Sequence, residues 1–402
     1  MEVRWGISGT ATIALKNMRS IISSSNGKLV AVASRKKERV GSFLSGLPIS
    51  LSSVKAHEGY DKFVIDIDNT FDILYCPLPV SVKVDYVLKA LTEGSLNVLV
   101  EKPVAKDLET AMTMLRAAEQ NDRVFMDGTM FMHHERTHSW FAAIRERSSN
   151  HPGRLNISAD FSFNGGADDS DFFTTNIRTQ GGDPAGALGD LGHYCIRVAL
   201  MAGAASSSPA SSSSSGPTYT YNGFSFEWPK LQSVECKALD GEYTDLITGC
   251  LALVKFDRMT LRFTCSFKEA LTQDVTIKYS STSDAFGDMV IKMDDFVIPH
   301  CPEVAGYDLQ HFPATDALVD FHRRVMRTNA RVETRDCCQE RCMVEKMGDL
   351  VLAKGDARTS EEKRFWRAVI YATQNVQDAC ERSYRNGGIA VSDLPSMDLP
   401  PL

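Results

Sequence analysis

The side chain with the clearest capacity for chemistry in this sequence is a lysine at the end of an apolar run. Residues 98–100 have the composition of a buried strand and are followed by Glu101, Lys102 and Pro103. In an open parallel sheet, ligands bind beyond the carboxyl ends of the strands. Pro103 stiffens the backbone behind the lysine, and a cis bond before it is one way to turn the lysine into a cleft. We therefore expect Lys102 to face a bound ligand, whereas the sequence shows no partner for Glu101.

The N-terminal residues have a pattern that binds dinucleotides. Residues 3–8 are typical of a strand, Gly9 of a turn, and the segment to about residue 23 of a helix. Free N–H groups at such a helix start bind a pyrophosphate. Ala11 occupies the position of a motif glycine and crowds this approach, so an ordinary strand-turn-helix is an equal alternative. The cofactor contacts expected here are Gly6, Ser8, Gly9, Thr10, Ala11, Thr12 and Ile13.

The end of the second strand favours a phosphorylated cofactor. Residues 29–33 form an apolar run that is followed by Ser34, Arg35 and Lys36. An NAD site has an acid here, about 20 residues past the glycines, that binds the ribose 2′-hydroxyl. A hydroxyl and cations instead suit the 2′-phosphate of NADP, and Arg35 is also able to lie on the adenine. The alternative, an exposed basic helix start, is less favoured by this position.

Strands and helices alternate through residue 126. Strands are expected at 51–56, 71–76, 98–100 and 123–126, and helices at 59–66, 81–93 and 108–121. This alternation predicts a doubly wound parallel sheet with right-handed crossovers. Residues 1–126 are therefore expected to form an α/β Rossmann domain that binds NADP.

Beyond residue 126 the pattern changes to that of an α+β domain over residues 127–393. A helix is expected at 131–147, and strands at 155–163, 234–238, 244–256, 259–267, 273–279 and 288–291. These runs predict a large open, mostly antiparallel sheet, with helices at 316–327 and 360–384 against it. The serine-rich segment 204–217 is expected to be a flexible surface insertion, and the tail 394–402 to be poorly ordered.

Composition excludes several classes of protein. The 402 residues carry a net charge of −7 without a basic stripe, so no nucleic-acid partner is expected. No apolar run is long enough to span a bilayer and no signal peptide is evident, which predicts a cytoplasmic protein, with organellar targeting left open. The ten scattered cysteines are typical of reduced thiols, and without a Cys-x-x-Cys pair no metal site is expected.

These motifs together resemble the Gfo/Idh/MocA oxidoreductase family. The resemblance rests on residues 6–11, 33–35, 77–79, 101–103 and 181–194. Within the family, the sequence is similar to the dihydrodiol dehydrogenase and xylose dehydrogenase branch, and residues 126–137 resemble a plant-type uncharacterised subgroup. The resemblance implies a homodimer formed through the open sheet. It also implies further cofactor contacts at Pro77, Leu78, Pro79, Glu101 and Lys102.

The same resemblance implies that Lys102, Asp190 and Tyr194 are the catalytic residues. Residues four apart share a helix face, so Asp190 and Tyr194 would face one point while His193 faces elsewhere. A nearby ammonium lowers the pKa of a tyrosine, so Tyr194 beside Lys102 could exchange a proton with a substrate hydroxyl. From the residues alone, a core tyrosine is an equal alternative, and His193 is a second candidate for the acid/base.

Other residues are weaker candidates for the substrate pocket. Phe131, His134, Arg178 and His193 could reach it, although a surface ion pair is the commoner role of an arginine. The family often has asparagine after Pro-x-Pro and histidine three residues later, whereas this chain has Val80 and Lys83. The nicotinamide side of the site is therefore expected to be held differently.

The sequence thus predicts an NADP-dependent oxidoreductase. It would transfer hydride between the nicotinamide and a small molecule, namely a sugar, a cyclic diol or a related carbonyl compound. The alternative is a non-catalytic NADP-binding sensor of the same fold.

Overall fold

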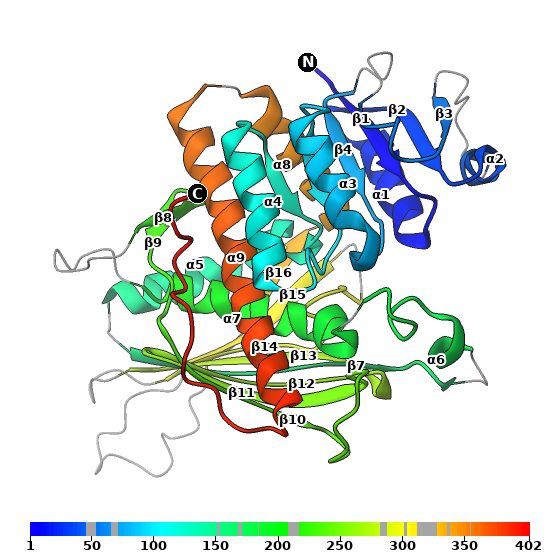
Figure 1. The fold of residues 1–402 in the computed structure, drawn as a ribbon. Coiled ribbons are helices and arrows are strands. Elements are labelled where there is room, and N and C mark those ends of the chain that lie inside the picture. Colours follow the sequence, from blue (N-terminus) through cyan, green and yellow to red (C-terminus); the bar gives the residue numbers. More distant parts are fainter. Residues whose placement is uncertain are drawn as a thin grey trace, which may run out of the picture.

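The computed structural model describes residues 1–45, 54–65, 71–150, 153–167, 171–183, 185–207, 217–281, 288–300, 304–311, 328–335, 338–353 and 355–402. Two large sheets organise these residues, one formed by the first 127 residues and the other by residues from 153 onward. Figure 1 shows the first sheet with its helices above the second, larger sheet.

The first sheet has six parallel strands in the order β3-β2-β1-β4-β5-β6. The strands are β1 Val3–Ser8, β2 Gly27–Ser34, β3 Lys55–Glu58, β4 Ile73–Cys76, β5 Asn97–Val100 and β6 Phe125–Asp127. The helices between them are α1 Thr12–Ser23, α2 Lys37–Ser45, α3 Val80–Thr92 and α4 Leu108–Gln120. The strand order reverses between β1 and β4, which is where such sheets bind ligands. The predicted Rossmann fold is confirmed.

Burial explains why these segments become strands. The side chains of β4 and β5 are buried throughout, as expected for a parallel sheet covered on both faces. Gly6 in β1 is required by packing, because a Cβ there would lie 2.7 Å from the ring of Phe71. These strands end at the residues that were expected to do chemistry.

The second sheet has eight strands in the order β10-β11-β12-β7-β13-β14-β15-β16. The neighbours β7 and β12 are parallel, and the other neighbouring pairs are antiparallel. The strands are β7 Gly153–Asn164, β10 Leu231–Ala238, β11 Gly249–Phe256, β12 Met259–Ser266, β13 Lys268–Ser281, β14 Met289–Met293, β15 Val304–His311 and β16 Thr328–Arg335. A small hairpin adds β8 Tyr219–Tyr221 and β9 Phe224–Phe226. The predicted mostly antiparallel sheet is confirmed.

Helices connect the two sheets. They are the 3-10 turn η1 Met130–His133, α5 Glu135–Asn150, α6 Phe172–Thr175, the π-turn η3 Leu188–Gly192, α7 His193–Ala205, α8 Gln339–Leu352 and α9 Ala357–Arg385. The long helix α9 packs on α7 and β10 and also on α4 and β6 (Figure 1). Helix α8 packs on α1. The C-terminal helices therefore complete the packing of the first sheet, although the sequence assigned their part of the chain to the second domain.

Three expected elements differ from the structure. Residues 59–65 form turns closed by bonds of the i to i−3 type and not a helix, beginning at Gly59 with φ of +81°. The helix expected at 131–147 is interrupted at His134, which is extended and accepts a hydrogen bond from the Arg136 amide on Nδ1. The strand expected from residue 244 begins at Gly249, because Thr244 bonds instead to the Leu246 carbonyl within a loop.

The tail and the serine-rich segment also differ from expectation. The tail is held in place, since Tyr371 and Asn375 donate hydrogen bonds to the Ser396 carbonyl at 3.1 and 3.0 Å. The first two residues of the expected insertion 204–217 are buried residues of α7, and its central part, 208–216, lies outside the described residues. So do the start of the strand expected at 51–56 and the whole of the helix expected at 316–327. Strands β15 and β16 and helix α8 were not expected.

The cysteines follow the expectation of free thiols with one exception. Seven described cysteines are free, and six of these are buried. Cys342 is disulfide-bonded, which contradicts the expectation for that residue.

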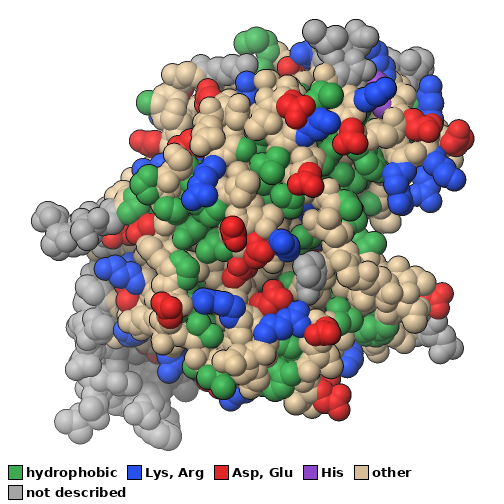
Figure 2. All heavy atoms as spheres, in the orientation of Figure 1, with side chains coloured by type: hydrophobic (Ala, Val, Ile, Leu, Met, Phe, Trp, Pro, Cys, Tyr) green, Lys and Arg blue, Asp and Glu red, His purple; other side chains and the backbone are tan. Residues whose placement is uncertain are grey.

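The surface view shows acidic and basic side chains mixed over one face of the molecule, with basic side chains gathered at the edge occupied by α2 (Figure 2). Within the described parts of the chain, none of the helices combines the length and the apolar character that crossing a membrane requires.

Candidate active site

A cavity of about 260 Å³ lies where the carboxyl ends of β4 and β5 meet the start of α7. It brings together Lys102, Asp190 and Tyr194, the three residues expected to be catalytic. Helices α1 and α8 complete the wall through Ile13, Asn17, Glu340 and Met343. Residues from distant parts of the sequence therefore share one cavity.

Lys102 is held by Asp190. Its Nζ forms an ion pair with the Asp190 carboxylate and donates to the Asp190 carbonyl at 2.9 Å. Arg178 approaches the other carboxylate oxygen, with Nε 2.7 Å from Oδ2. Burial raises the pKa of Asp190, but Lys102 and Arg178 outweigh it and hold the pKa below its usual value. Burial lowers the pKa of Lys102, and the charge of Asp190 raises it above the usual value. Lys102 is therefore a firmly protonated, oriented ammonium.

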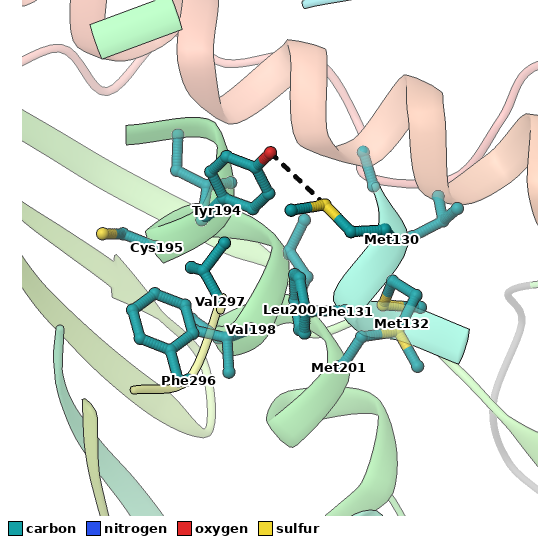
Figure 3. Packing of buried hydrophobic residues seen from close by; sticks show 14 of the residues in the cluster. Met130, Phe131, Met132, Tyr194, Cys195, Val198, Leu200, Met201, Phe296 and Val297 are labelled. Carbon is teal, nitrogen blue, oxygen red and sulfur yellow. Dashed lines mark hydrogen bonds between the residues drawn. The ribbon is translucent and has the colours of Figure 1, made fainter. Parts of the chain in front are cut away.

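Tyr194 lies against this ammonium. The Nζ of Lys102 is 4.8 Å from the centre of the tyrosine ring. The tyrosine hydroxyl donates to the sulfur of Met130 at 3.6 Å, as the dashed line in Figure 3 shows. Asp190 lies in η3 and Tyr194 in α7, and both line the cavity, so they face the same space as expected.

The expected lowering of the tyrosine pKa is wrong for this structure. Burial raises the pKa of Tyr194 to about 12, and the opposing charge of Lys102 only partly offsets it. The side chain is 5 % exposed, so the phenolate loses most of its solvation. The ammonium lowers the pKa of Tyr194, as expected, but burial raises this pKa by more. At neutral pH Tyr194 is therefore a neutral phenol, which is the form that donates a proton.

The loop that carries Lys102 is braced by Lys83. This second lysine, 1 % exposed, donates to the carbonyls of Glu101 at 2.6 Å and of Pro103 at 2.8 Å. The peptide bond between Lys102 and Pro103 is cis, as anticipated. Lys83 was noted in the sequence only as a departure from the family pattern. Lys83 lies one turn after Val80 and one turn before Val87, on the buried face of α3. This helical spacing was the feature of the sequence that could have indicated its burial.

Glu101 has partners that the sequence did not reveal. Its carboxylate accepts hydrogen bonds from the Tyr75 hydroxyl at 2.6 Å and from Asn17 at 3.3 Å. Burial raises the pKa of Glu101 against the opposing effects of Tyr75 and Lys102. A Cβ at Gly128 would lie 2.9 Å from this carboxyl group, so Gly128 leaves the space that it fills.

His193 belongs to a separate buried network. Its Nε2 is 2.9 Å from the Thr129 hydroxyl and 3.6 Å from the Asp127 carboxylate. Asp127 in turn pairs with Arg197 at 2.7 Å. Burial lowers the pKa of His193 to about 4. The histidine is thus neutral, engaged and absent from the cavity lining, which favours Tyr194 as the proton donor.

The weaker substrate candidates are divided by the structure. Arg178 lines the cavity, but Phe131 and His134 do not. Phe131 packs against Tyr194 and Phe296 behind the cavity, with ring centres 6.2 and 6.0 Å apart. It can therefore support Tyr194 without touching a ligand.

The residues expected to hold the cofactor form a path from β2 to the cavity. Gly9 makes the turn after β1 with φ of +105°. Helix α1 begins after Ala11 without a side-chain cap and without an acid in its first turn, which leaves its N–H groups to a phosphate. Arg35 and Lys36 are exposed just past the end of β2. Among the expected contacts, Ile13, Pro77, Leu78, Pro79, Glu101 and Lys102 line the cavity. These residues fit a dinucleotide whose nicotinamide end reaches Lys102.

Two of the expected cofactor contacts face the protein interior. The Ser8 hydroxyl donates to the Tyr86 hydroxyl at 2.8 Å within the core. Gly6 lies against Phe71. Any contact that these residues make with a cofactor would have to come from the backbone.

A possible cation site is already engaged. In the described part of the chain, Asp294, Asp295 and His300 bring three potential ligand atoms together. Asp295, however, is paired with Arg136 and accepts the His300 amide at 2.7 Å. This arrangement is explained by the fold.

Comparison with known proteins gives a family match for the N-terminal domain. Residues 3–129 match the model of the Gfo/Idh/MocA family, described as an oxidoreductase family with an NAD-binding Rossmann fold. This match confirms the expected family for the Rossmann domain of the chain. The plant-type subgroup within it stays a prediction.

Two curated relatives match about half of the chain. A dTDP-3,4-didehydro-2,6-dideoxy-alpha-D-glucose 3-reductase of Streptomyces antibioticus is 30 % identical over 201 residues, which are 50 % of this chain. A D-xylose 1-dehydrogenase (NADP(+)) of Haloferax volcanii is 27 % identical over 199 residues, which are 49 % of this chain. The chain spans 56 % of the length of each relative.

Solved structures of the same fold cover nearly the whole chain. A 3-ketoreductase from Actinomadura kijaniata in complex with NADP and TDP-benzene has a TM-score of 0.69 at 20 % identity and covers 95 % of this chain and 98 % of its own. An aldose-aldose oxidoreductase from Caulobacter crescentus complexed with glycerol has a TM-score of 0.68 at 15 % identity, over 98 % and 100 % of the two chains. At these identities the likeness establishes the shared fold.

Proposed function

We propose that this protein is an NADP-dependent oxidoreductase that transfers hydride between the nicotinamide and a sugar or a related small carbonyl or hydroxyl compound. The observation that carries the proposal is the convergence of Lys102, Asp190 and Tyr194 on one cavity at the switch point of the Rossmann sheet. The names of the relatives support the substrate class, since they include a sugar 3-reductase and a xylose dehydrogenase.

The cofactor preference rests on charge. Arg35 and Lys36 follow β2 where an NAD-specific site has an acid, and both are exposed to receive a 2′-phosphate. A relative named as NADP-dependent and a neighbouring structure in complex with NADP support the same preference. Bound NADPH would supply the hydride.

The chain's own residues carry out the proton transfer. In the reductive direction, the Tyr194 hydroxyl donates its proton to the substrate oxygen. The tyrosinate that remains is stabilised by the ammonium of Lys102, which Asp190 keeps protonated and in place. The buried position of Tyr194 limits the access of water to this transfer.

Two measurements test the proposal. Titration should give a much lower Kd for NADPH than for NADH, and Arg35→Ala should reduce that difference without changing the affinity for NADH. Tyr194→Phe should lower kcat by about 10²–10⁴-fold, the range of general acid catalysis, with the NADPH affinity retained. Equal affinities for the two cofactors would refute the NADP preference. NADPH binding without turnover across a broad panel of sugars and carbonyl compounds would favour the sensor alternative.

Two further expectations stay predictions. They are the homodimer formed through the second sheet and the cytoplasmic location.

A further inference from the structure

The cavity contains a carboxylate that has neither a role in the proposed proton transfer nor a hydrogen-bond partner among the described residues. Asp183 lines the cavity and is 6 % exposed. Its Oδ1 is buried, and among the described residues it has no hydrogen-bond partner. An unpaired buried carboxylate is costly to keep, so its presence beside the catalytic residues requires an explanation.

The position of Asp183 is defined by its surroundings. The preceding residue, Gly182, accepts a hydrogen bond from the Ser81 amide at 3.3 Å, which ties the loop to the start of α3. The Asp183 carbonyl accepts the Gly186 amide at 3.2 Å. A Cβ at Gly189 would lie 2.9 Å from Asp183 Oδ1, so the carboxyl group occupies space that a glycine leaves open. The carboxylate is therefore held in place by the fold.

The other charged groups around the cavity are already paired. Asp190 engages both Lys102 and Arg178. Lys83 donates to two backbone carbonyls, and Lys16 pairs with Glu340 at 2.5 Å. Because the four cationic side chains that line the described part of the cavity are engaged, none is left for a phosphate. Asp183 adds an acceptor that suits a neutral hydroxyl donor and repels an anion.

We propose that Asp183 is a substrate-binding residue that accepts a hydrogen bond from a hydroxyl group of an uncharged polyhydroxylated substrate and disfavours phosphorylated ones. The inference rests on the proposed function and narrows its substrate class to free sugars or polyols. A carboxylate that hydrogen-bonds a substrate hydroxyl discriminates strongly, because it is left unpaired when that hydroxyl is missing.

The ionisation of Asp183 should make substrate binding depend on pH. Burial and the charge of Asp190 raise the pKa of Asp183 to about 7, against the opposing charges of Lys102, Lys83 and Arg178. The stronger acceptor, the carboxylate, therefore forms as the pH rises through neutrality. The KM for a free sugar is expected to fall over this interval.

The test compares wild type with Asp183→Asn and with the control Asp171→Asn, an exposed aspartate of the neighbouring segment. For a free sugar that the wild type turns over, Asp183→Asn should raise KM at least tenfold, change kcat less than threefold and abolish the pH dependence of KM. The preference for the free sugar over its phosphate ester should decrease. The control should match the wild type.

An unchanged KM in Asp183→Asn would overturn the inference, whether or not kcat also falls. A wild type that binds NADPH but turns over no substrate would instead refute the proposed function. Calorimetric titration of the same sugars into both proteins tests Asp183 in that case too, since weaker sugar binding by the variant supports the inference and equal binding refutes it.

Discussion

Replacing Lys83 by methionine removes the brace behind Lys102 with little change in side-chain volume. Lys83 is buried and donates to the carbonyls on both sides of Lys102, at 2.6 and 2.8 Å. The Lys83→Met variant would leave two buried carbonyl oxygens without a donor. Because these carbonyls belong to Glu101 and Pro103, the change acts directly on the segment that positions Lys102.

The magnitude follows from the two lost hydrogen bonds. A hydrogen bond to a charged group contributes about 1.5–3 kcal/mol, so the two together contribute roughly 3–6 kcal/mol. The variant no longer buries an ammonium, and the lowered pKa of Lys83 shows that this burial is unfavourable. After this offset we expect a net loss of about 2–4 kcal/mol in the free energy of unfolding. Misplacing Lys102 should also lower kcat by about tenfold to a hundredfold.

Urea unfolding measures the first effect and steady-state kinetics the second. Lys89→Met, on the same helix but partly exposed, is the matched control and should resemble the wild type in both assays. A Lys83→Met variant with wild-type stability and wild-type kcat would refute the reasoning that this lysine positions the catalytic loop.

Three further changes have definite expected outcomes. Asp190→Asn should lower the pKa of Lys102, because the charge that raises it is removed. The fall in kcat on the alkaline side of the pH profile should therefore begin at a lower pH than in the wild type. Asp183→Asn should stabilise the protein at pH 8 more than at pH 5: the carboxyl group ionises near 3.8 when unfolded and near 7 when folded, so its penalty appears as the pH rises between these values and reaches roughly 4 kcal/mol above them. Thermal unfolding at the two pH values checks this, and an equal shift at both would contradict it. Gly128→Ala should destabilise by about 1–3 kcal/mol through contact with the Glu101 carboxyl group, and a variant with an unchanged unfolding midpoint would show that the carboxyl group moves freely.

Local patterns were sufficient to predict the Rossmann fold. The apolar strands β1, β2, β4 and β5 are buried. Their alternation with helices along the chain implies a parallel sheet. The C-terminal helices were harder to place, because the packing of α9 on α4 depends on contacts between segments far apart in the chain. Periodicity shows which face of a helix is buried, but it does not show what covers that face.

The candidate site was predicted where residue type and position agree, as for Lys102 and Tyr194. It was missed where burial decides the role. Lys83 and Asp183 are charged residues whose burial the sequence does not show, and their roles depend on neighbours that only the fold supplies. The pKa of Tyr194 was predicted with the wrong sign for the same reason, since desolvation exceeds the effect of the ammonium.

The role of Tyr194 as the proton donor is tested by the rate of nicotinamide oxidation or reduction, followed by absorbance, for wild type and Tyr194→Phe with free sugars and their keto derivatives. We expect NADP-linked turnover of at least one such compound by the wild type, and a loss of about 10²–10⁴-fold in kcat in a variant that still binds NADPH. Turnover by Tyr194→Phe at the wild-type rate would contradict it.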